Sequence, residues 1–224
     1  MSLNTGTMIP PKVSAHILHC ASPNSDELLR ETLESLIRSD YESLEIKVIE
    51  NGCKVEWLHW SGVIHLEKNV GVAKGYNAGL RGAGRSEYTL LINNDVEVHK
   101  EMVSHMVSLA QTDPRIGIVS PRIYYHGTNK IWYDGGLFNP WTGVTRHKNI
   151  RKIGPADKIP KQTQWATGAC MLIKREVIDK IGYFNEAYSP AYGEDADFSF
   201  RARQAGFKIV VNPKAKLWHK ISQS

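Results

Sequence analysis

The chain has 224 residues, a length that suits one α/β domain better than two. Its composition, 42% hydrophobic and 23% charged, is that of an ordinary globular protein and excludes collagen, coiled coil and a largely disordered chain. No apolar run approaches the roughly 20 residues that a membrane span needs. The three cysteines are widely spaced and form no CxxC pair, so neither a disulfide framework nor a structural zinc site is indicated. We therefore expect a cytoplasmic protein.

The formal net charge of +5 is concentrated in one segment, residues 146–161. The segment contains one acid, Asp157, and these basic residues: Arg146, Lys148, Arg151, Lys152, Lys158 and Lys161. Such a loop could attract a phosphate-bearing substrate or an anionic surface, and a simple solvated loop is the alternative interpretation. No DNA- or RNA-binding motif accompanies it, so we expect no nucleic-acid partner.

Short β-like runs alternate with amphipathic helical stretches, which predicts an α/β fold with a mostly parallel sheet. Residues 1–11 are polar and are expected to be a disordered or cloning-derived extension, so that the folded domain covers 12–221. In the first part of that domain, the expected strands are 12–19, 46–50, 63–66, 88–92 and 116–120, and the expected helices are 26–38, 71–80 and 101–111.

The stretch 123–164 lacks a helical period and contains Gly135-Gly136, so we expect a long loop with short strand-like pieces. Regular structure should then return, with strands at 169–174, 208–211 and 215–218 and helices at 176–181 and 195–205. Nothing along the chain reads as a linker between two domains.

Polar residues follow several of the expected strands, at the edge where α/β sheets bind ligands. They are Glu50-Asn51, Asn93-Asn94-Asp95, Glu194-Asp195 and His219. The carboxylate and amide oxygens of residues 93–95 suit Mg²⁺ or Mn²⁺ completed by phosphate oxygens, although the same sequence also favours an Asx turn. A lone histidine such as His219 is more often a hydrogen-bonded residue than a metal ligand.

Two helix starts could also carry chemistry. The segment 69–77 is rich in small residues, and its free N–H groups could bind an anion, although tight packing against the sheet explains it equally well. The second helix start is at residues 194–197. The helix macrodipole by itself could explain the acids there, Glu194, Asp195 and Asp197. Asp197 and Arg201 are spaced i, i+4 and could pair, which would leave Asp195 available as a general base.

Taken in order, these segments resemble the family-2 inverting glycosyltransferases, which have the GT-A fold, and the bacterial rhamnosyltransferase-like branch is the most similar. The resemblance runs from about Val13 to His219. The matching pieces are 13–18, 48–52, 69–77, 91–96 with its Asn-Asn-Asp, Gly135-Gly136 with 142–143, 166–173, 194–197 with Arg201, and 218–219.

The resemblance implies a Rossmann-like, mostly parallel sheet flanked by helices, with a smaller antiparallel portion on the acceptor side. Residues 12–122 would form the nucleotide-binding half and 123–221 the acceptor and catalytic half. The implied reaction transfers a hexose or deoxyhexose, with inversion, from a UDP- or dTDP-linked sugar to a hydroxyl of a glycan or lipid-linked glycan. It would be assisted by Mg²⁺ or Mn²⁺. A lipid-linked acceptor would bring the protein to the inner face of the membrane.

The resemblance also implies roles for single residues. Asp195 would be the catalytic base, and Asp95 and His219 would hold the metal. The nucleotide would contact Glu50, Asn51, Asn69, Lys74, Asn77, Asn93 and Asn94. The sugar and acceptor pocket would be lined by Thr167, Gly168, Ala169 and Glu194.

The chain departs from the family pattern at three places. His19-Cys20-Ala21 replaces a Thr-Tyr-Asn type sequence, Glu50 replaces the usual aspartate, and Asn93 replaces the first acid of an Asp-x-Asp motif. Two other functions are alternatives: a sugar nucleotidylyltransferase, and a catalytically silent nucleotide- or carbohydrate-binding domain. The first would carry a Gly-rich, Arg-containing loop after its first strand, which is missing here, and the presence of Asp95 and Asp195 argues against the second.

Overall fold

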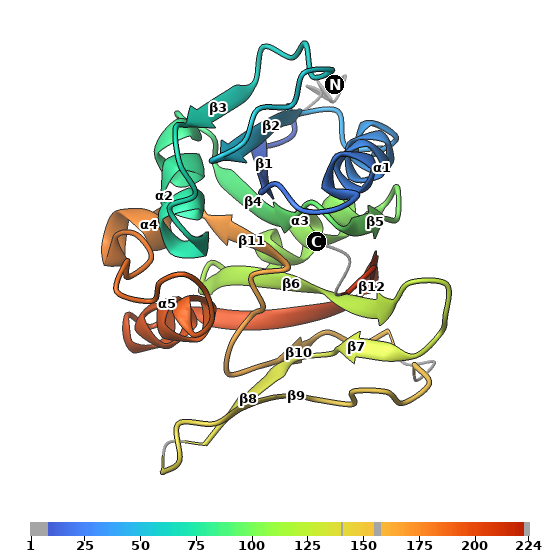
Figure 1. The fold of residues 1–224 in the computed structure, drawn as a ribbon. Coiled ribbons are helices and arrows are strands. Elements are labelled where there is room, and N and C mark those ends of the chain that lie inside the picture. Colours follow the sequence, from blue (N-terminus) through green and yellow to red (C-terminus); the bar gives the residue numbers. More distant parts are fainter. Residues whose placement is uncertain (1–8, 140, 155–157, 222–224) are drawn as a thin grey trace, which may run out of the picture.

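A computed structural model describes residues 9–139, 141–154 and 158–221 of the chain (Figure 1). Its centre is one large sheet. Across the sheet the strands follow the order β10 (Lys161–Gln162), β12 (Lys208–His219), β6 (Ile116–Tyr125), β11 (Cys170–Lys174), β4 (Tyr88–Asn93), β1 (Val13–His19), β2 (Leu44–Asn51) and β3 (Val63–Leu66). No helix in the described part of the chain is long and apolar enough to cross a bilayer.

The sheet is mostly parallel, as predicted. β1 runs parallel to β2 and β4, β2 to β3, and β6 to β12, whereas β11 lies antiparallel between β4 and β6. Two short strands add to it antiparallel, β5 (Val96–Val98) on β12 and β7 (Ile131–Tyr133) on β6. β8 (Gly136–Phe138) and β9 (Thr145–His147) form a separate antiparallel pair. The expected small antiparallel portion therefore lies in 123–164, where no helical period was found.

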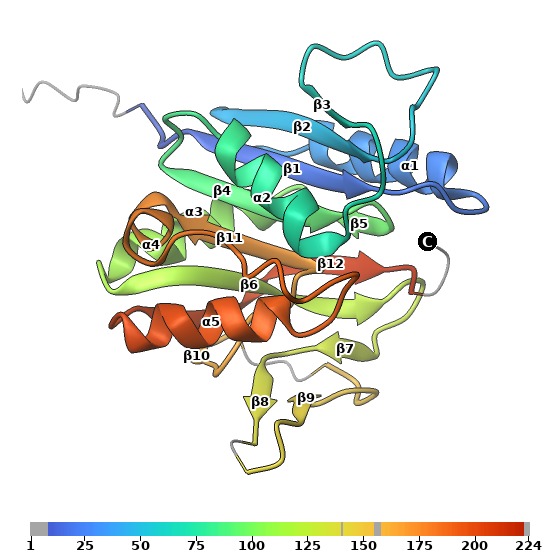
Figure 2. The same ribbon diagram turned by 60° about the vertical axis from the view of Figure 1, so that its left-hand side comes forward.

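Helices cover both faces of the sheet (Figure 2). One face packs against α1 (Ser25–Ile37) and α3 (Met102–Thr112), the other against α2 (Val72–Gly82), α4 (Arg175–Ile181) and α5 (Glu194–Gln204). Successive strand residues point to opposite faces, so the neighbours Leu90 and Leu91 belong to different core clusters. Burial on both faces explains why 90–92 of β4 and 170–173 of β11 are continuously apolar.

Some element boundaries differ from the sequence prediction. β6 continues to Tyr125, so the chain passes without a break from 12–122 into 123–221. β12 is a single strand where two were expected, with an irregular register between Asn212 and Lys216. Pro213 lies in that irregularity and has no N–H to donate to a ladder, which explains why the sequence pattern looked interrupted. β5 was not predicted.

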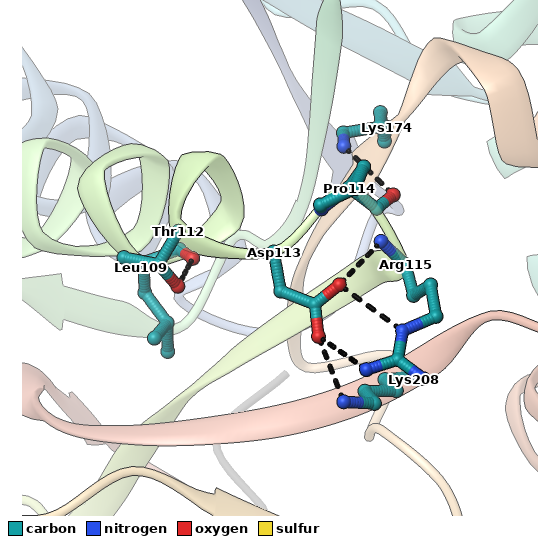
Figure 3. Close-up of polar contacts among 7 residues, drawn as sticks. All are labelled: Leu109, Thr112, Asp113, Pro114, Arg115, Lys174 and Lys208. Carbon is teal, nitrogen blue, oxygen red and sulfur yellow. Dashed lines mark hydrogen bonds and ion pairs between the residues drawn. The ribbon is translucent and has the colours of Figure 1, made fainter.

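A cluster of charged side chains holds the ends of three elements together at the edge where β6 and β12 begin (Figure 3). The Asp113 carboxylate accepts hydrogen bonds from the Arg115 guanidinium at 3.1 and 3.2 Å and from Lys208 Nζ at 2.7 Å. These two cations lower the pKa of the Asp113 carboxyl well below its usual range. Lys174 Nζ donates to the Pro114 carbonyl at 3.2 Å, which adds the end of β11. The cluster lies at the opposite end of β12 from His219.

Candidate active site

A cleft of about 540 Å³ opens where β4 and β12 end and α5 begins. Of the residues that the sequence nominated, those that line it are Asn93, Asp95, Thr167, Gly168, Ala169, Glu194, Asp195 and His219. The remaining lining residues are Val72, Tyr76, Trp132, Thr145, His147, Trp165, Ala191, Tyr192, Gly193 and Ile221. The fold thus brings Asp95, Asp195 and His219 to one cavity, although Asp95 and His219 are 124 residues apart along the chain.

The short strand β5 places His219 beside Asp95. Asp95 lies in the bend between β4 and β5, and the antiparallel ladder of β5 with β12 sets His219 opposite Val96. As a result, His219 Nε2 lies 2.9 Å from Asp95 Oδ1, and both side chains are buried. The backbone N–H of Lys220 donates to the Asp95 carbonyl at 2.9 Å and extends the same ladder.

The Asp95–His219 pair fits a divalent cation. The second ring nitrogen of His219, Nδ1, is buried and has no hydrogen-bond partner among the described residues. A carboxylate oxygen and an imidazole nitrogen are both donors that such metals accept. No group of three His, Cys, Asp or Glu side chains suited to a metal occurs in the described part of the chain, so phosphate oxygens and water would have to supply the other ligands.

Asp195 is oriented by backbone donors. Its Oδ2 accepts the Gly168 N–H at 2.9 Å and its Oδ1 accepts the Ala196 N–H at 2.7 Å. Burial raises the pKa of the Asp195 carboxyl, and these hydrogen bonds act in the opposite direction. The predicted pair between Asp197 and Arg201 is present, with Arg201 Nε 2.8 Å from Asp197 Oδ2. Asp195 itself forms no ion pair with any described residue.

Two neighbours complete this wall of the cleft. Glu194 is buried, and burial followed by the nearby Asp195 charge raises the pKa of its carboxyl. Tyr76, which the sequence analysis did not single out, is fully buried on α2. Its hydroxyl lies 2.7 Å from the Gly168 carbonyl oxygen and 2.8 Å from Asn93 Oδ1. Tyr76 therefore joins the end of β4 to the turn that holds Asp195.

Glu50 and Lys74 lie outside the residues that line the cleft. Glu50 is buried at the end of β2, where its Oε1 accepts the Val55 N–H at 2.8 Å and its Oε2 lies 3.0 Å from His65 Nδ1. Lys74 is exposed on α2. The extra methylene of Glu50, compared with aspartate, is used to reach the following loop. Their contacts with a nucleotide stay predictions.

The start of α2 is occupied by protein groups rather than left free for an anion. Asn51 Nδ2 donates to Asn69 Oδ1 at 3.1 Å, and the same Asn69 oxygen accepts the Gly71 N–H at 2.9 Å. The Val72 N–H donates to the Pro190 carbonyl at 2.8 Å. Gly71 has φ 82°, and a Cβ there would lie 2.7 Å from that carbonyl oxygen. The loop before α5 therefore covers this helix start, for which the sequence had left anion binding and tight packing equally open.

Asn77 and Asn94, both nominated as nucleotide contacts, point elsewhere. Asn77 Nδ2 donates to the Phe184 carbonyl at 3.0 Å and to Glu186 Oε1 at 2.9 Å, which ties α2 to the loop after α4. Asn94 is buried with its Nδ2 3.0 Å from His19 Nδ1. Neither side chain lines the cleft, and their contacts with a nucleotide stay predictions.

The structure adds an aromatic wall that the sequence analysis missed. Trp132, His147 and Trp165 line the cleft, with ring centroids 4.6 Å apart for Trp132–His147 and 5.4 Å apart for His147–Trp165. His147 Nδ1 lies 2.9 Å from the Trp132 carbonyl oxygen, and burial lowers the pKa of the imidazole. A Cβ on Gly136 would lie 2.2 Å from the Trp165 indole, so this close approach requires glycine. In the sequence, the Gly135-Gly136 pair was the feature that could have indicated this close packing.

Three comparisons place the chain among known proteins. It is 33% identical over 222 residues to the protein y4gI of Sinorhizobium fredii, covering 90% of this chain and 24% of that one. It is 25% identical over 155 residues to the N-acetylglucosaminyl-diphospho-decaprenol L-rhamnosyltransferase of Mycobacterium tuberculosis, covering 62% and 48% of the two chains. GalNAc-T7 with UDP, GalNAc and Mn²⁺ has the same fold, with a TM-score of 0.77 at 18% identity over 95% of this chain and 44% of that one.

The chain therefore spans less than half the length of each of these three proteins. The model of one family, Glycosyl transferase family 2, matches residues 22–182. That range begins after β1, which ends at His19, and includes Asp95, the 167–169 turn and the aromatic wall. On this match and the shared architecture, the chain belongs to glycosyl transferase family 2 and has the GT-A fold.

Proposed function

We propose that the chain is the catalytic part of an inverting glycosyltransferase that moves a hexose or deoxyhexose from a UDP- or dTDP-linked sugar to a hydroxyl of a glycan or lipid-linked glycan. The observation that carries the proposal is the convergence of Asp95, His219 and Asp195 on one cleft. Its volume, about 540 Å³, is in the range of small-molecule sites. The rhamnosyltransferase relative, named for a decaprenol-linked diphosphate sugar, supports a lipid-linked acceptor.

Asp195 is the general base of this mechanism. It takes the proton from the acceptor hydroxyl while that oxygen forms a bond to the anomeric carbon, on the face opposite the departing diphosphate. The bond from the anomeric carbon to the phosphate oxygen breaks and its electron pair leaves with the nucleoside diphosphate. One displacement inverts the configuration, so no covalent intermediate and no second nucleophile are needed. The Gly168 and Ala196 N–H groups fix the carboxylate for this task.

Asp95 and His219 would hold Mg²⁺ or Mn²⁺ together with the phosphates of the donor. When bound, the cation neutralises charge that develops on the leaving diphosphate. Asn93 contacts the Tyr76 hydroxyl and lines the cleft, and we propose that it contacts the phosphates. Glu50, Asn51, Asn69 and Lys74 are proposed to lie toward the nucleoside, because the carboxyl end of β2 neighbours that of β1.

The sugar and acceptor occupy the rest of the cleft in this proposal. Thr167, Gly168, Ala169 and Glu194 line it on the side of Asp195. Trp132 and Trp165 offer flat apolar surfaces that can pack against the C–H face of a sugar ring. Asp195, with its raised pKa and without an ion-pair partner among the described residues, favours transfer over a silent binding domain.

A thermal unfolding experiment tests the nucleotide and metal parts together. UDP, dTDP and GDP are each added with Mn²⁺, with Mg²⁺ or with EDTA. A ligand present at about 100 times its Kd stabilises the folded state by about 2.7 kcal/mol, so the matching nucleotide should raise the midpoint clearly, and only with metal. Equal stabilisation in EDTA would contradict the role of Asp95 and His219. A donor screen for released nucleoside diphosphate then identifies the sugar, and no release from any donor would contradict glycosyl transfer.

A further inference from the structure

The segment that carries β8 and β9 projects from the body of the protein. We call residues 135–139 and 141–154 the β8–β9 arm. Figures 1 and 2 both show its β8–β9 hairpin extending away from the large sheet, whereas residues 151–153 return to β7 and hydrogen-bond to it. Trp141, beside its turn, is 95% exposed, and Ile153 is 75% exposed. Further exposed apolar side chains of the arm are Leu137, Val144 and Ile150. An isolated exposed apolar residue is ordinary, but this many on one short segment indicates a contact surface.

The arm is also basic. Residues 135–154 contain Arg146, Lys148, Arg151 and Lys152 and no Asp or Glu. None of these four side chains forms an ion pair with any described residue. Elsewhere in the chain, the cations Arg115, Arg175 and Arg201 do pair with neighbouring carboxylates. The positive charge of the arm is therefore available to an anionic partner.

The base of the arm is fixed to the body. A buried ion pair joins Arg122 of β6 to Asp134, with Nε 2.8 Å from Oδ1. Asn149 Nδ2 donates to the other carboxylate oxygen of Asp134 at 2.9 Å. The Lys148 N–H donates to the Gly135 carbonyl at 2.7 Å. These contacts hold the backbone of the arm, so its exposed side chains are presented from a defined framework.

The arm connects its outer surface to the cleft. Thr145 and His147 of β9 line the cleft. Side chains alternate along a strand, so Arg146, between them, points to the other side. Arg146 pairs in register with the exposed Leu137 of β8. Whatever the outer surface binds is therefore held next to the mouth of the cleft.

We propose that the β8–β9 arm docks the protein on an anionic bilayer, with Trp141 at the level of the headgroups and the arginines and lysines against lipid phosphates. Tryptophan is enriched at membrane–water interfaces, and clustered basic residues near such a surface bind anionic lipids. Arginine and tryptophan are also enriched in protein–protein interfaces, but lysine is depleted there, so Lys148 and Lys152 favour the bilayer over a protein partner. The proposal goes beyond glycosyl transfer and would survive the failure of that assignment, since it concerns binding to lipid alone.

Sedimentation with vesicles tests it. The intact chain is mixed with vesicles of phosphatidylcholine alone or of phosphatidylcholine with phosphatidylglycerol, at low and at high salt. Binding should require phosphatidylglycerol and weaken with salt. Arg146→Gln combined with Arg151→Gln should weaken it about twenty-fivefold, at about fivefold for each charge. Trp141→Ala should weaken it about tenfold, through the lost burial of the indole.

The matched control removes the same charge elsewhere. Arg85, in the turn after α2, and Arg203 of α5 are exposed outside the arm, so Arg85→Gln with Arg203→Gln should leave vesicle binding unchanged. An equal loss from this pair would mean attraction by net charge alone and would overturn the proposal, as would no binding by the unaltered chain. Light scattering that detects a dimer dissolved by Trp141→Ala would instead assign the arm to contact between two copies.

A second readout does not depend on weakened variants. Brominated lipids in the same vesicles should quench tryptophan fluorescence of the bound protein, and Trp141→Phe should abolish that quenching while keeping an aromatic ring. Quenching that is unchanged in Trp141→Phe would place another surface on the membrane and would contradict the proposal.

Discussion

The two walls of the cleft hold their carboxylates in different ways. On the wall made by β4, β5 and β12, Asp95 is buried with a side-chain partner, His219, at 2.9 Å. On the wall made by α5, Asp195 contacts two backbone N–H groups, and burial raises the pKa of its carboxyl. The same residue type is thereby prepared for two tasks. A carboxylate beside an imidazole suits a cation, and a desolvated carboxylate without a cationic partner suits proton uptake.

The largest effect is expected on the α5 wall. Asp195→Asn keeps the shape of the side chain but removes the base, so transfer should fall by about 10²- to 10⁴-fold. The proposed metal and nucleotide contacts lie on the other wall, so Mn²⁺-dependent stabilisation by the nucleoside diphosphate should persist. Release of the nucleoside diphosphate in the presence of donor and acceptor measures the first quantity, and thermal unfolding measures the second.

Asp197→Asn is the matched control for that variant. It changes the same residue type two positions along the same helix, and it breaks the ion pair with Arg201. We expect a lower unfolding midpoint and transfer within a few-fold of the unaltered chain. If Asp195→Asn keeps full activity while Asp197→Asn loses it, the base has been assigned to the wrong carboxylate.

A smaller effect is expected on the other wall. His219→Gln removes the imidazole beside Asp95, and the Mn²⁺ concentration needed for half-maximal stabilisation by nucleotide should rise about 10- to 100-fold. His126→Gln is the control, because His126 Nε2 also lies beside a carboxylate, 3.1 Å from Glu97 Oε2, but outside the cleft. If His219→Gln needs the same Mn²⁺ concentration as the unaltered chain, the Asp95–His219 pair does not bind the metal.

The sheet and most helices could be predicted because burial leaves a pattern in the sequence. β4 has an apolar centre, 90–92, and the start of α5 carries acids where the macrodipole favours them. β5 could not be predicted, because three residues directly after an Asn-Asn-Asp turn are too few to show an alternating pattern. The proximity of His219 to Asp95 depends on that strand, so it followed from the family resemblance and not from periodicity.

The candidate site was predictable where a chemically reactive side chain lies at the end of a strand or the start of a helix. Asp95 and Asp195 are acids at the ends of a strand and at the start of a helix, and both line the cleft. The sequence could not show whether Asn77 and Asn94 contact a ligand or the protein itself, because an amide side chain forms the same kinds of hydrogen bond with both. The aromatic wall was missed because Trp132 and its neighbours lie in a stretch whose short strands show no clear period.

The smallest expected effect concerns the pH dependence on the α5 wall. Asp195 must be deprotonated to act, so transfer should be present at high pH and lost as the pH falls through a pKa above the usual value for aspartate. Burial and backbone hydrogen bonds set the pKa of Asp195, and the Asp195 charge in turn raises the pKa of Glu194, so Glu194→Gln should leave this acidic limb in place. A profile of kcat against pH measures it. Glu194 also lines the cleft, so only the position of the limb is diagnostic; a limb that disappears in Glu194→Gln would make Glu194, rather than Asp195, the titrating base.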